Sequence, residues 1–72
     1  MNGQIDYKQR DTEKIVAFLK DRDRVNVEDI ITGSGAEKLR VYPILAELSF
    51  AGRIRVVEEG KLGEPLVVAM SL

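Results

Sequence analysis

AEKLRVYPILAELSFAGRIRVV, residues 36–57, predicts a helix that passes directly into a strand. Three apolar residues, spaced by four and then by three positions, fall on one stripe, as in a helix laid against a core. They are Val41, Leu45 and Leu48. Gly52 then stands where a helix needs a left-handed C-terminal residue, a conformation that glycine adopts most easily. Because the β-like residues 54–57 follow at once, no loop separates the two elements.

Two further helices are expected before this stretch. The first covers about residues 8–22, and Asp6 and Asp11 are both possible N-caps for it. The second is short, about residues 27–32, with Asn26 able to cap it. Two glycines follow within four residues and predict a sharp connection to the third helix. The apolar stripe of the first helix is formed by Ile15, Phe18 and Leu19.

Pro43 leaves the start of the third helix open. If the helix runs over about residues 36–51, Pro43 removes the backbone bond to Leu39 and should kink it. If the helix starts near Leu39, Pro43 lies in or near the first turn, where proline is tolerated.

Two β-like runs close the chain, about residues 53–58 and 66–71, joined by a polar turn that contains two glycines. This pattern is typical of a β-hairpin with a long loop. The final run, residues 66–70, does not alternate polar with apolar residues, which indicates burial on both faces. An exposed apolar edge of this length would invite pairing with another chain.

Composition limits what the chain can be. With 72 residues it is expected to form one domain, residues 1–72, with a thin core. It has no cysteine and no histidine, so the common nucleophile–base pairs and nitrogen or sulfur metal sites are excluded. We expect no catalytic site, no cofactor, no bound metal and no small-molecule substrate. The longest apolar run has five residues, so we expect no membrane contact and a cytoplasmic location.

The order of elements resembles that of the winged helix-turn-helix family. The most specific part of the resemblance is LAELSFAGRI, residues 45–54, which is similar to the junction between that family's recognition helix and its wing. The resemblance implies an α+β, mainly helical fold with three helices and a C-terminal β-hairpin wing. It also implies a third strand at about residues 24–27 and a third helix that reads the major groove of DNA.

Two functions of different class remain open. The first is a DNA-binding transcriptional regulator acting as a homodimer, which the resemblance implies. Its contacts to double-stranded DNA would come from one set of charged residues on the third helix and the wing. These are Glu37, Lys38, Arg40, Arg53, Arg55 and Lys61.

The alternative is a protein-interaction or dimerisation module that keeps the fold without binding DNA. A net charge of −1 and glutamates on the third helix and at the wing tip favour this alternative, because DNA affinity needs cationic side chains. In both cases we expect a homodimer built on the apolar hairpin, with Leu39 as a further candidate. The candidate interface residues are Phe50, Val57, Leu66, Val67, Val68 and Met70. The other explanation for the apolar hairpin is that Ile5 and Tyr7 fold back over the sheet.

Overall fold

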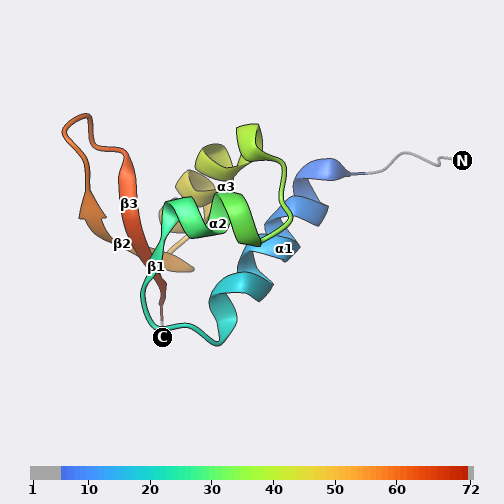
Figure 1. The fold of residues 1–72 in the computed structure, drawn as a ribbon, viewed down its shortest axis with the longest axis horizontal. Coiled ribbons are helices and arrows are strands. Elements are labelled where there is room, and N and C mark those ends of the chain that lie inside the picture. Colours follow the sequence, from blue (N-terminus) through green and yellow to red (C-terminus); the bar gives the residue numbers. More distant parts are fainter. Residues whose placement is uncertain (1–5, 72) are drawn as a thin grey trace, which may run out of the picture.

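The computed structural model describes residues 6–71, which form a small α+β domain with three helices and a three-stranded antiparallel sheet (Figure 1). Each helix and strand expected from the sequence is present, with bounds within two residues of those expected. The elements are α1 Tyr7–Lys20, β1 Val25–Asn26, α2 Val27–Gly33, α3 Lys38–Phe50, β2 Ile54–Glu59 and β3 Pro65–Met70. The hairpin of β2 and β3 projects away from the helices (Figure 1).

The strand order is β1-β3-β2, so β3 is the central strand of the sheet. β1 pairs with β3 at Val25 and Val68, and β2 pairs with β3 from Ile54 opposite Met70 onward. The last apolar run is therefore not an edge strand, the position in which it would have invited pairing with another chain. β3 pairs with β2 along most of its length and with β1 at Val67 and Val68, so only the middle of the strand is hydrogen-bonded on both sides.

The core lies where the three helices meet the inner face of the sheet. All three helices contribute fully buried side chains, and the sheet contributes Val25, Ile54 and Val68. The largest fully buried side chains are Ile15, Leu19, Val27, Ile30, Val41, Leu45 and Val68. The stripe of α3 predicted from the sequence is confirmed, and Ile44 joins it at 2% exposure.

The helix starts obey the capping rules in part. Asp6 caps α1, since its side chain accepts a hydrogen bond from the Gln9 amide at 2.9 Å. Asp11, the other candidate, lies inside α1 and is buried. Asn26 occupies the N-cap position of α2, but its side chain makes no capping hydrogen bond.

The start of α3, which the sequence left open, is resolved by the structure. The helix starts at Lys38, and the Glu37 carboxylate caps it by accepting from the Leu39 amide at 2.6 Å. Pro43 therefore lies in the second turn rather than the first, and it leaves the Leu39 carbonyl without an intrahelical donor.

At the other end of α3, Gly52 adopts φ 77°, as predicted. Its amide donates to the Ser49 carbonyl at 3.0 Å, and the Arg53 amide donates to the Leu48 carbonyl at 2.9 Å. This pair of bonds is a Schellman motif, which satisfies the last carbonyls of the helix and turns the chain into β2.

Candidate functional site

The most unusual surface of the described chain is the outward side of α3. We call Leu39, Tyr42, Ala46 and Phe50 the outer stripe; their spacing of three, four and four places them in one row on the helix. Leu39 is 82% exposed, Tyr42 42% and Phe50 96%. Since the opposite side of α3 is buried in the core, this helix is apolar on two sides. A helix of that kind is normally covered on both.

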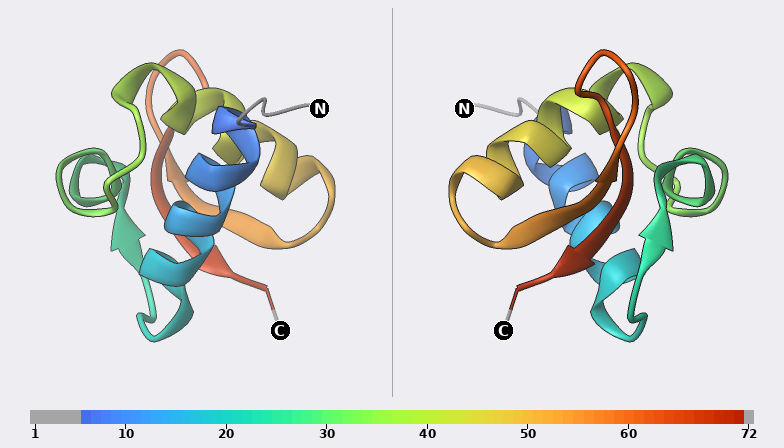
Figure 2. Two further views of the ribbon diagram at one scale, coloured as in Figure 1. Left: turned by 90° about the vertical axis from the view of Figure 1, so that its right-hand side faces the viewer. Right: turned by 90° about the vertical axis from the view of Figure 1, so that its left-hand side faces the viewer.

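α3 lies beside the hairpin of β2 and β3 (Figure 2, right). Side chains of these elements line a groove next to the outer stripe. It encloses about 780 Å³ and is lined mainly by apolar groups of α3, β2 and the start of β3. Ala46 and Phe50 border this groove on one side, and on the other they border a shallower hollow that includes Glu47. The residues lining the groove are Tyr42, Leu45, Ala46, Ser49, Phe50, Val56, Glu59, Gly63, Glu64 and Pro65.

The turn between β2 and β3 is held by Glu64. Its carboxylate accepts from the Leu62 amide at 2.9 Å, and its carbonyl accepts from the Gly60 amide at 2.8 Å. A side chain at position 60 would require this carboxylate to move. The turn presents Leu62 to solvent at 93% exposure, so a further apolar group stands at the tip of the hairpin.

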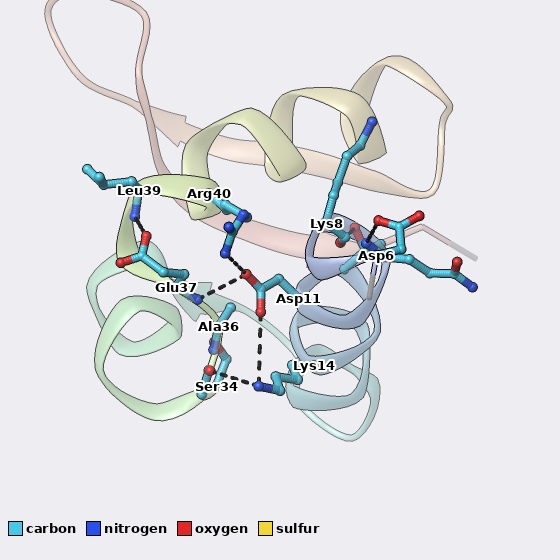
Figure 3. A network of polar contacts seen from close by, with 12 residues as sticks. Asp6, Lys8, Asp11, Lys14, Ser34, Ala36, Glu37, Leu39 and Arg40 are labelled. Atoms are coloured by element: carbon cyan, nitrogen blue, oxygen red, sulfur yellow. Dashed lines mark hydrogen bonds and ion pairs between the residues drawn. The ribbon is translucent and has the colours of Figure 1, made fainter. Parts of the chain in front are cut away.

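A buried carboxylate joins α1 to the start of α3 (Figure 3). Asp11 is only 5% exposed. Its Oδ2 accepts from Arg40 Nη1 at 3.0 Å and from the Glu37 amide at 3.2 Å. Lys14 Nζ lies 4.0 Å from its Oδ1 and also donates to the Gly35 carbonyl at 3.3 Å. The network fixes the turn before α3 against the first helix.

The pKa of Asp11 reflects these partners. Burial by itself raises the pKa of the carboxyl. The hydrogen bonds from Arg40 and the Glu37 amide lower it, with help from the charges of Arg40 and Lys14, and together they outweigh burial. The pKa of Asp11 therefore lies below its ordinary value, and the carboxylate stays charged at neutral pH.

The structure separates the residues predicted to contact DNA. Arg40 is half-buried and bound to Asp11, so its guanidinium is occupied within the fold. Glu37 is the cap of α3. Lys38 is exposed at the first turn of α3, whereas Arg53 is exposed beyond the last. The two remaining residues are Arg55, exposed on β2 and donating to the Met70 carbonyl at 3.4 Å, and Lys61, exposed in the hairpin turn.

The residues predicted to form a hairpin dimer differ in their exposure to solvent. Val68 is fully buried in the core, and Met70 is half-buried and packs against the core. Val57 and Val67 are half-buried. Leu66, at 43% exposure, and Phe50 remain accessible.

The other expected cover of the hairpin involved the N-terminal residues. Ile5 lies outside the described residues. Tyr7 belongs to α1, and its ring centroid lies 5.4 Å from the Arg40 guanidinium carbon of α3. Tyr7 is therefore engaged between two helices and does not cover the sheet.

Sequence reasoning missed three features of the structure. Tyr42 and Ala46 complete the outer stripe, and their spacing from Leu39 and Phe50 was legible in the sequence. Asp11 is spaced by four and eight from Ile15 and Leu19, which places it on the buried side of α1. Leu62 lies in the predicted polar turn, but its apolar side chain was not singled out there.

Within residues 6–71, no helix is long and apolar enough to cross a membrane, and no group of three or more acidic side chains is placed to hold a metal ion. Comparison of the chain with models of protein families, with curated proteins and with solved structures finds no match.

Proposed function

We propose that this chain is a protein-interaction module with a winged helix-turn-helix fold that does not act by reading DNA. The observation that carries the proposal is the outer stripe of α3. On a domain this small, a row of apolar side chains beside an apolar groove is typical of a surface that another protein covers.

The family assignment is supported by the order of elements. A short helix, a tight turn and a longer helix precede an antiparallel hairpin, and a two-residue strand after α1 completes the sheet. The direct passage from α3 through Gly52 into β2 supports it as well.

The charges on α3 support an interaction with protein more than one with DNA. Arg40, the best candidate for a base contact, is held by a buried carboxylate. Glu47 pairs with Lys8 of α1 at 2.9 Å, and this hydrogen bond raises the pKa of Lys8, so the lysine stays charged but lies against a carboxylate. DNA-binding surfaces depend on cations that neutralise phosphates along one face.

DNA binding is the second candidate function. It is favoured by Lys38 and Lys61, which are both exposed on the two elements that the resemblance assigns to DNA contact. On this alternative the protein is a regulator, and its affinity should fall steeply as salt rises.

An NMR titration separates the two functions. Amide shifts are followed while generic duplex DNA is added at low salt, and separately while indole, a neutral aromatic probe, is added. We expect DNA to leave the amides of residues 38–47 and 59–64 unmoved. Indole should shift residues around the groove, and this response should persist at high salt because apolar binding is not screened.

The opposite pattern would overturn the proposal. DNA-induced shifts on α3 and the hairpin turn that fade with salt would establish a nucleic-acid module. Lys38→Gln is the matched variant: it should weaken such shifts on α3 and reduce their salt dependence if they report phosphate contact, and leave the indole response unchanged.

A further inference from the structure

The outer stripe has a symmetry of its own. Ala46, a small residue, lies midway between Tyr42 and Phe50, each four positions away. If two such helices pack antiparallel with Ala46 facing Ala46, each Phe50 comes to lie against the other copy's Tyr42. A small residue at the crossing point lets the two backbones approach closely, and the paired aromatic rings gain beyond their buried area.

The groove beside the stripe has room for that aromatic side chain. Tyr42, Ala46, Val56 and Pro65 line it, so a ring entering beside Tyr42 would contact apolar groups from both α3 and the hairpin. Phe50 itself is 96% exposed and gains no cover from its own chain. The same molecule thus carries both an exposed aromatic ring and a hollow that fits one.

Charges at the two ends of the groove are complementary in the same arrangement. Arg53 is exposed just past the C-terminal end of α3. At the other end, Tyr42 borders hollows shared with Pro65 and Leu66, and Pro65 is paired with Glu59 in the sheet. An antiparallel mate would carry its Arg53 past Tyr42 toward Glu59. A two-fold axis makes this contact twice.

We infer that the partner of this surface is a second copy of the chain, packed antiparallel through α3 with Phe50 in the groove of its mate. The inference rests on the proposed function, because it names the partner of the same surface. It differs from a dimer built on the hairpin, to which the fully buried Val68 would contribute no contact. It is isologous and closed, so the expected assembly is a dimer and not a filament.

Cysteine cross-linking tests this geometry directly, because the chain has no native cysteine. Ala46→Cys places a thiol on the two-fold axis, and Ala17→Cys places one at an exposed site of α1 as a matched control. Under mild oxidation we expect Ala46→Cys to form a disulfide-linked dimer at least about tenfold faster, since association raises the effective concentration of the facing thiols.

Phe50→Asp is the second variant. Because Phe50 does not contribute to the core, the substitution should leave the fold intact and abolish the advantage of Ala46→Cys. Sedimentation of the unmodified chain at high micromolar concentration should show a dimer, and sedimentation of Phe50→Asp a monomer.

Two results would overturn the inference. One is a monomer at high micromolar concentration. The other is a dimer that cross-links equally through positions 17 and 46, which would place the contact elsewhere. Neither result decides the proposed function, because the DNA titration does not depend on the dimer, and the indole titration can be repeated on Phe50→Asp, in which no second copy fills the groove.

Discussion

At the scale of single residues, Asp11 shows how one buried carboxylate can position a helix. It lies within α1 and binds the Arg40 side chain and the Glu37 amide from the start of α3. Breaking a buried charged contact leaves the remaining partner unpaired, which is more harmful than the loss of a surface pair. The start of α3, and with it the position of Leu39, depends on this residue.

We predict that Asp11→Asn lowers the melting temperature by several degrees at neutral pH. The folded-state pKa of Asp11 is lowered, so its contribution is present above the unfolded-state pKa and is lost as the pH falls through the folded-state pKa. Thermal unfolding measured from neutral pH to below about pH 4 should show the two proteins converging in acid. Asp23→Asn, at an exposed site, is the control and should change little. A constant gap at every pH would contradict the prediction.

Gly52 is a second residue on which the fold depends. Its φ of 77° suits glycine, and a side chain there would meet nothing within 4 Å. Gly52→Ala should therefore lose about 1–2 kcal/mol of unfolding free energy through backbone strain alone. Gly52→Asn should lose less, since asparagine tolerates the left-handed region better. Urea unfolding measures both, and equal losses would mean that strain is not the cause.

At the scale of elements, α3 carries an irregularity that stability alone does not favour. Pro43 is exposed in its second turn and denies the Leu39 carbonyl a donor. Pro43→Ala should raise the unfolding free energy by about 1–2 kcal/mol, because alanine's helix propensity and restored N–H outweigh the entropy gained by the unfolded chain. Chemical unfolding gives the value. A loss of stability would show that the proline fits α3 without strain. Tyr42→Ala removes a groove side chain next to Pro43 and is the comparison: it should not reproduce the gain in unfolding free energy.

The elements also show how far the sequence predicts the structure. Gly52 and the stripe of α3 follow local rules, and both are confirmed. The role of β3 was not predictable in the same way. An unbroken apolar run fits an exposed edge or a covered centre equally well, and only its pairing with Val25, some 43 positions away, decides that β3 is central.

The candidate site follows the same division. The outer stripe is a local spacing and could be read from the sequence. The pairing of Arg40 with Asp11 could not be read from the sequence, because Asp11 is 29 residues away on another helix. Whether a cationic side chain is available to contact DNA therefore depends on its tertiary partners, whereas apolar periodicity depends on the local sequence alone.

At the scale of the whole molecule, α3 has two apolar sides. One side packs against α1, α2 and the sheet, whereas the outer stripe on the other side is left exposed by residues 6–71. A domain of this size buries only about 60% of its unfolded surface, so a second apolar contact adds a large share to its total. We therefore expect association and folding stability to be coupled, with unfolding shifted to higher temperature as protein concentration rises.

Charge exchange across the two-fold axis gives the sharpest test at this scale. Arg53→Glu and Glu59→Arg should each weaken self-association by about threefold to tenfold, since each rim pair contributes under about 1 kcal/mol and occurs twice. The double variant should recover most of the loss, because it restores the pair with its signs reversed. Sedimentation at low and high salt measures all four proteins, and the differences should shrink at high salt. Failure of the double variant to recover would show that these two side chains do not meet, even if the dimer itself is real.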